Sequence, residues 1–148
     1  MNHTPQALAL VLLAAGCSPP IGGLEGTEAV TVYSLDPQIA LPGAPESELF
    51  HSYRILGHSE VREPARRAEI IEAVQDAIRA GGDQAKCFNP RHGVATINGN
   101  SRTDFVICFE CSNVTVGAEE QMHAISGSAQ PVLDRVLREA GVTPAPSP

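Results

Sequence analysis

The sequence is that of a small acidic protein, with 148 residues and a net charge of −7. Nucleic-acid backbones and anionic membrane surfaces attract positively charged patches, and no basic run occurs in this chain. We therefore expect no nucleic-acid partner. Aromatic residues make up only 4% of the chain, so the core must be built mainly from Val, Ile, Leu and Ala. A core of this kind is thin, and covalent cross-links would add useful stability.

The N-terminus has the features of an export signal. The apolar run ALALVLLAA at residues 7–15 is too short to span a bilayer and has the size of a signal-peptide hydrophobic region. It leads into Gly16 and Cys17, and residues 13–17 resemble the lipobox of bacterial lipoproteins. There, cleavage before the cysteine leaves a thiol that carries diacylglycerol and further acyl chains such as palmitate. The alternative is an ordinary secretory signal that ends beside a cysteine.

These features divide the chain into four parts. Residues 1–16 are the predicted signal peptide, and residues 17–28 are a lipidated tether rich in Ser, Pro and Gly. Residues 29–142 form the predicted folded domain, and residues 143–148 are a polar tail that we expect to be disordered. The predicted location is the bacterial cell envelope, where the protein is anchored to a membrane through Cys17 and faces the periplasm or the exterior.

Two strands and a helix are predicted in the first half of the domain. Residues 29–35 alternate and are rich in β-branched side chains, and residues 50–61 give a second strand, bent at Gly57. From Pro64 the apolar period becomes helical and Gly81-Gly82 supplies a stop, which predicts an amphipathic helix over residues 64–80. Its apolar face is expected to contain Ala68, Ile71, Val74, Ala77 and Ile78.

The second half predicts a hairpin, a short strand and a short helix. Asn98-Gly99 is a strong turn signal between residues 94–97 and 105–111, and residues 113–116 again look like a strand. Residues 131–140 form a short amphipathic helix. The order of elements predicts an α+β domain in which one long amphipathic helix covers a small, mainly antiparallel sheet, with a short C-terminal helix.

The cysteines allow three kinds of chemistry. If Cys17 is acylated, three thiols remain in a compartment that permits disulfides. A three-residue hairpin loop places Cys87 opposite Cys111, whereas a two-residue Asn98-Gly99 turn places Cys87 diagonal to Cys108. We expect a structural disulfide between Cys87 and Cys111, with Cys108 as the alternative partner. The other hypotheses are a reactive thiol pair and a zinc site formed by Cys87, His92, Cys108 and Cys111.

Arg91 and His92 are the other candidate binding residues. A guanidinium and an imidazole in one turn could hold a carboxylate or a phosphate. The simpler interpretation is that Arg91 pairs with Glu110 across the hairpin and that His92 is an ordinary strand residue. No phosphate-binding loop, zinc-protease motif or convincing catalytic triad is present in the sequence.

The runs Cys87 to His92 (CFNPRH) and Asp104 to Cys111 (DFVICFEC) resemble those of a group of small secreted or lipoprotein-like bacterial proteins. The resemblance extends from the second predicted strand to the end of the hairpin. It implies a family and no activity. We therefore expect a non-enzymatic, membrane-tethered envelope lipoprotein that acts as a binding or structural module. The alternative is a metal-binding or thiol-redox protein.

Overall fold

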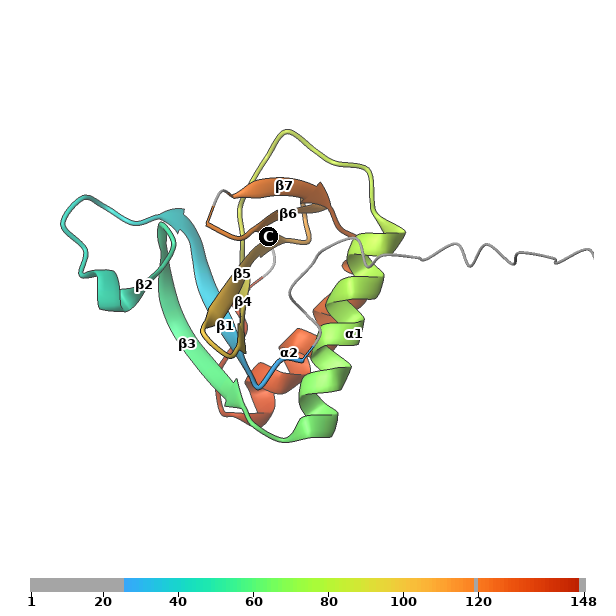
Figure 1. The fold of residues 1–148 in the computed structure, drawn as a ribbon. Helices are drawn as coiled ribbons and strands as arrows, with labels where there is room; N and C mark the ends of the chain where they lie inside the picture. The colour runs from blue at the N-terminus through green and yellow to red at the C-terminus, as the bar shows by residue number, and fades with distance from the viewer. Residues whose placement is uncertain (1–25, 119, 147–148) are drawn as a thin grey trace, which may run out of the picture.

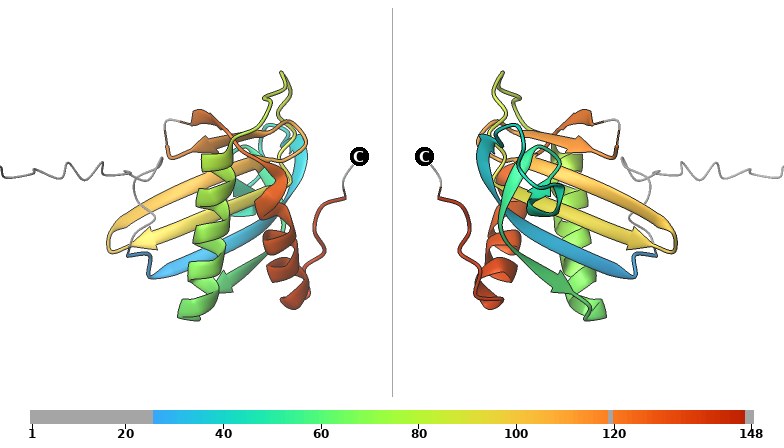
Figure 2. Two further views of the ribbon diagram at one scale, coloured as in Figure 1. Left: turned by 90° about the vertical axis from the view of Figure 1, so that its right-hand side faces the viewer. Right: turned by 90° about the vertical axis from the view of Figure 1, so that its left-hand side faces the viewer.

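The computed structural model describes residues 26–118 and 120–146, so the predicted signal peptide and Cys17 lie outside the described residues. The described residues form an antiparallel sheet of seven strands together with two α-helices. The strands lie in the order β2-β3-β1-β4-β5-β6-β7 and the sheet is curled (Figure 1). Both helices lie on the same face of the sheet (Figure 2).

The elements have the following bounds. The strands are β1 Ala29–Ile39, β2 Leu49–Phe50, β3 Tyr53–Val61, β4 His92–Asn98, β5 Ser101–Cys108, β6 Asn113–Val116 and β7 Gln121–Ala124. The helices are α1 Pro64–Ala80 and α2 Gln130–Glu139, and short 3₁₀ helices occupy Glu46–Glu48 and Gly127–Ala129.

Helix α1 begins and ends where local signals in the sequence place it. The Glu63 carboxylate accepts hydrogen bonds from the N–H groups of Ala65 and Arg66, at 2.9 and 2.6 Å, and Pro64 takes the first turn. Gly81 ends the helix with φ of 66°, a conformation that favours glycine. The predicted range of residues 64–80 is therefore confirmed.

The apolar face of α1 is rotated slightly from the predicted one. Ile70 is fully buried, with 0% of its surface exposed, whereas Ile71 is only partly buried and Ala68 is exposed. Val74, Ala77 and Ile78 are buried as predicted. Two adjacent isoleucines satisfy a helical period almost equally well, so the period alone did not decide between them.

The α+β class and the antiparallel sheet are confirmed, but a single long helix covering the sheet is not observed. Helix α1 has 17 residues and shares the face with α2, which buries Leu133, Val136 and Leu137. Side chains of both helices meet the strands in one core. Its largest fully buried members are Val30, Val32, Ile70, Val74, Val94, Phe105, Ile107, Ile125, Leu133 and Leu137.

A smaller core covers part of the opposite face of the sheet. It contains Leu35, Phe50, Tyr53, Ala95 and Val106. Phe50 lies directly over Gly93, where a Cβ atom would come within 2.7 Å of the Phe50 ring. Phe50 of β2 can pack directly on β4 because Gly93 has no side chain at the point of contact.

His51 links the two edges of the curled sheet. The sequence predicted one strand over residues 50–61, but His51 has φ of 55° and separates β2 from β3. Its Nδ1 lies 3.2 Å from a Glu120 oxygen in the β6–β7 turn, and its Nε2 lies 3.3 Å from an Asp104 oxygen on β5. Glu120 also has a positive φ, 49°. His51 and Glu120, which both have a left-handed backbone conformation, thus contact each other between the β2–β3 turn and the β6–β7 turn.

The hairpin turn differs from both predicted registers. Asn98 pairs with Ser101, so the turn residues are Gly99 and Asn100. β7 was not predicted, since Gln-Met-His-Ala is short and mostly exposed at the edge of the sheet.

The two ends of the domain are longer than predicted. Glu28, assigned to the tether, donates its N–H to the carbonyl of Ile97 at 2.7 Å. In the predicted disordered tail, the carbonyl of Thr143 accepts a hydrogen bond from the Ser34 hydroxyl, and Ala145 is only 8% exposed. Residues 143–146 therefore pack against the domain.

Candidate functional site

The irregular segment of residues 81–91, which joins α1 to β4, is called the connecting segment below. It contains Cys87, which is bonded to Cys111 with a Cα–Cα distance of 5.6 Å. The bonded pair is the expected one, but the register argument for it is wrong. β4 begins only at His92, so Cys87 does not lie on a strand opposite Cys111. The disulfide instead ties a loop to the turn that follows β5.

The side chain of Asn113 also holds the connecting segment in place. It is 4% exposed, and its Nδ2 donates to the carbonyls of Ala85 and Cys87 at 2.8 and 3.0 Å. Its Oδ1 accepts a hydrogen bond from Gln84 Nε2 at 2.8 Å. One buried amide thereby satisfies backbone and side-chain groups of a segment without regular structure. No pattern in the sequence indicates this role of Asn113.

The third cysteine of the domain, Cys108, does not join the other two. It is a buried free thiol whose sulfur accepts a hydrogen bond from the N–H of Asn89 at 3.3 Å. His92 bonds to Asp134 rather than to a cysteine. Among the described residues no group of three or more His, Cys, Asp and Glu side chains is arranged to hold a metal ion. The Cys87/His92/Cys108/Cys111 set is therefore not assembled in this structure.

Arg91, at the end of the connecting segment, contacts three acceptors. Its Nη1 donates to Glu110 Oε2 at 2.8 Å and to the carbonyl of Asn89 at 3.3 Å, and its Nε donates to the carbonyl of Pro146 at 2.6 Å. The predicted pairing of Arg91 with Glu110 is confirmed. The side chains are 16% and 39% exposed, so the pair is partly shielded from water. The guanidinium also ties residues 143–146 to the domain.

His92 is the first residue of β4 and is only 2% exposed. Its Nε2 lies 2.8 Å from Asp134 Oδ1 on α2, and its ring meets Phe109 edge to face, with 5.3 Å between the ring centroids. Burial lowers the pKa of His92 below its usual value, although the Asp134 carboxylate opposes this shift and Arg91 adds to it. The neutral ring therefore donates Nε2–H to the carboxylate and has an acceptor at Nδ1.

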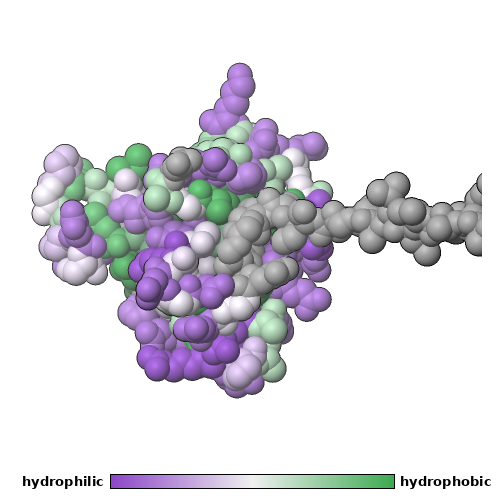
Figure 3. Space-filling view, viewed as in Figure 1, coloured by the Kyte–Doolittle hydropathy of each residue, from purple (hydrophilic) through white to green (hydrophobic). Residues whose placement is uncertain are grey.

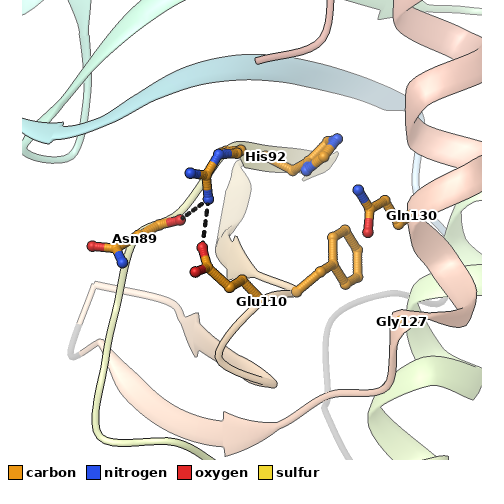
Figure 4. Close-up of a pocket in the computed structure, with 7 residues that line it drawn as sticks. Asn89, His92, Glu110, Gly127 and Gln130 are labelled. Atoms are coloured by element: carbon orange, nitrogen blue, oxygen red, sulfur yellow. Dashed lines mark hydrogen bonds and ion pairs between the residues drawn. The ribbon is translucent and has the colours of Figure 1, made fainter. Parts of the chain in front are cut away.

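These residues border a cavity of about 290 Å³ between the start of β4, the turn after β5 and the start of α2 (Figure 4). Figure 4 shows the His92 ring and the Gln130 side chain next to each other, with Glu110 on another side of the cavity. The side-chain amide of Asn89 is turned away from the others. The lining residues are Asn89, Arg91, His92, Phe109, Glu110, Gly127 and Gln130.

The structure therefore places both predicted binding residues, Arg91 and His92, in one cavity. Gln130 and Asp134 were not predicted, because both belong to a helix about 40 residues further along the chain and only the fold brings them near. Phe109 and Glu110 lie inside the DFVICFEC run. The sequence predicts Glu110 as the pairing partner of Arg91, and it predicts no role for Phe109.

The surface also exposes apolar side chains away from the cavity. Ile39, the last residue of β1, and Leu41, in the loop between β1 and β2, are 69% and 81% exposed. Figure 3 shows hydrophobic surface on the lobe that this loop forms. In the described part of the chain, no helix has the length and apolar content needed to cross a membrane.

Comparisons of the chain with protein families, with curated proteins and with solved structures give no match.

Proposed function

We propose that the protein is a lipid-anchored component of the bacterial envelope whose domain is a non-catalytic binding module. The anchor is supported by the lipobox-like residues that precede Cys17. A disulfide between Cys87 and Cys111 agrees with an oxidising compartment outside the cytoplasm.

The observation that carries the binding function is the cavity beside Arg91 and His92. It has an aromatic wall from Phe109 and a few polar groups that converge on it, as is usual for small-ligand sites. The polar groups are held in place by neighbours: Arg91 by Glu110, and His92 by Asp134. Side chains fixed in this way lose little freedom when a ligand binds. The arrangement therefore favours binding.

The binding function is tested by screening small polar molecules against the purified protein and following the side-chain amide of Gln130 by NMR. We expect at least one compound to shift that signal saturably, while the signal of Gln121, which is exposed on β7, stays constant. A screen in which compounds shift signals only outside the cavity would contradict the proposal.

The anchor is tested separately with Cys17→Ser. Two or three acyl chains, at about 0.8 kcal/mol per buried methylene, hold a domain firmly at a membrane. The variant should therefore appear in the soluble fraction after cell lysis, whereas the unaltered protein should sediment with membranes. A variant that still sediments would show that the anchor lies elsewhere.

The second candidate function is thiol or metal chemistry in the same region. It is favoured by the contact of the Cys108 sulfur with Asn89, two residues from Cys87, which places all three cysteines near the connecting segment. A zinc site would require the disulfide to be reduced first, because zinc binds thiolates. Thiol counting with and without reductant, followed by a zinc assay on the reduced protein, distinguishes this function from simple binding.

A further inference from the structure

We propose that the cavity binds a neutral sugar ring, best represented by an N-acetylated hexosamine; this inference rests on the proposed binding function. The cavity, at about 290 Å³, lies at the lower end of the range for small-ligand sites. It therefore suits a single ring better than a larger ligand.

The charge balance of the lining favours an uncharged ligand. Arg91 and Glu110 are joined by a hydrogen-bonded ion pair with an N–O distance of 2.8 Å. A charged ligand would have to break this pair or leave its own charge uncompensated in a partly desolvated site, and both are costly. A neutral polar ligand can bind while the pair stays intact.

The pair nevertheless keeps hydrogen-bonding capacity. The contacts of Arg91 with the described residues use Nε and Nη1, which leaves the N–H groups of Nη2 for a ligand. The contact of Glu110 within the described part of the chain uses Oε2, which leaves Oε1 as an acceptor. Planar groups with adjacent donors and acceptors match neighbouring hydroxyl groups, each of which is both a donor and an acceptor.

Gln130 and Phe109 complete the match to a sugar. The Gln130 amide faces the cavity and has a donor and an acceptor side by side, which is the complement of an acetamido group (Figure 4). Phe109 supplies an apolar surface, and its contact with the His92 ring fixes its position. The C–H face of a pyranose can pack on such a ring while its hydroxyls reach the polar groups.

The test is an NMR titration of the purified protein in a detergent without a sugar headgroup. The probes are N-acetylglucosamine, the cation glucosamine, the anion glucuronate and the zwitterion glycine. We expect N-acetylglucosamine to shift the Gln130 side-chain amide saturably and to bind more tightly than the charged probes. Gln130→Ala lacks this signal, so its titration is followed at the backbone amide of Phe109, which also lines the cavity. The affinity of this variant should fall about tenfold, the equivalent of one net hydrogen bond.

Two further variants make the test specific. Gln121→Ala removes an exposed side-chain amide on β7, outside the cavity, so the affinity of this variant should stay within about twofold of the original. Glu110→Gln removes the negative partner of Arg91 and should raise the affinity for glucuronate relative to N-acetylglucosamine.

The outcomes separate this inference from the proposed function. Tighter binding of glucuronate or glucosamine than of N-acetylglucosamine by the unaltered protein would overturn the preference for neutral ligands. Binding of glycine but of no sugar would overturn the sugar class and leave the binding function standing. If neither these probes nor the screened compounds shift the Gln130 amide, both proposals fail.

Discussion

Helix α1 and the connecting segment of residues 81–91 are neighbours in the chain, yet different interactions hold them. α1 is specified locally, by a capping carboxylate at Glu63, a proline in its first turn, a stripe of apolar residues and a glycine at its end. The connecting segment has no regular structure, and contacts with residues 107–113 hold it: the disulfide, the Asn113 amide and the backbone bond from Arg91 to Ile107.

The difference separates the part of the domain that gives stability from the part that forms the proposed binding site. The larger core, to which α1 contributes four buried residues, gives a rigid support. The connecting segment then presents Arg91 at the edge of that support and meets α2 across the cavity. Loops positioned by a rigid scaffold commonly carry binding residues. Here the loop itself is made rigid by one covalent bond and one buried side chain.

The largest expected effect on stability comes from a substitution in α1. Ile70→Ala should lower the free energy of unfolding by about 2–5 kcal/mol, because the side chain is completely buried and its loss leaves a cavity in the core. Ile71→Ala should cost less, since Ile71 is only partly buried. Urea unfolding of the two variants measures the difference. A larger loss for Ile71 would show that the helix faces the sheet with its other isoleucine.

Removal of the disulfide tests how the connecting segment is held. The bond joins residues separated by 24 positions, and the chain-entropy model gives about 3.5 kcal/mol for a loop of this length. Cys87→Ala combined with Cys111→Ala should therefore lower the urea midpoint strongly. Cys108→Ala keeps the disulfide and is the control. If the control and the double variant lose equal stability, the bond contributes little and packing holds the segment.

A smaller loss is expected for Asn113→Ala. The change leaves the carbonyls of Ala85 and Cys87 without their donor, at a cost of about 1–3 kcal/mol. The affected region should be local, so hydrogen exchange should accelerate in the connecting segment more than in α1. Equal acceleration in both would mean that the two regions unfold as one unit.

The smallest effect concerns pH and His92. Burial lowers the pKa of His92 in the folded state below the ordinary value of 6.5, so below that pH the unfolded chain binds more protons than the folded one. Stability should therefore fall as the pH decreases from about 6.5 toward the folded-state pKa and should not be lost further below it. His92→Gln should lack this component in urea unfolding across pH 5–8. The same slope in both proteins would assign the effect to other groups.

The sequence predicted those parts of the fold that depend on local signals. Pro64 and the Gly81-Gly82 pair place α1 to the residue, and the alternation of residues 29–35 identifies β1, although the strand continues to Ile39. The turn at Gly99 and Asn100 was misplaced by one residue, because Asn98-Gly99 and Gly99-Asn100 both contain a glycine suited to a positive φ. β7 depends on pairing with β6 and carries no strong pattern of its own.

The candidate site was predictable only in part, for the same reason. Arg91, His92 and the cysteines stand out as chemical types in an unusual run, so the sequence indicated the right stretch. Gln130, Asp134 and Asn113 are ordinary polar residues whose roles depend on contacts across 26 to 42 positions of sequence. Pro146 and Thr143 likewise gain partners only because the last residues return to the sheet.

One titration shows most directly whether the connecting segment, held by the disulfide, is needed for the proposed binding cavity. N-acetylglucosamine is titrated into the unaltered protein and into the Cys87→Ala, Cys111→Ala variant, under conditions where circular dichroism shows that both remain folded. We expect a saturable shift of the Gln130 side-chain amide in the unaltered protein and a loss of about tenfold or more in affinity in the variant. Equal affinity in both proteins, with the same amide shifting, would contradict this expectation.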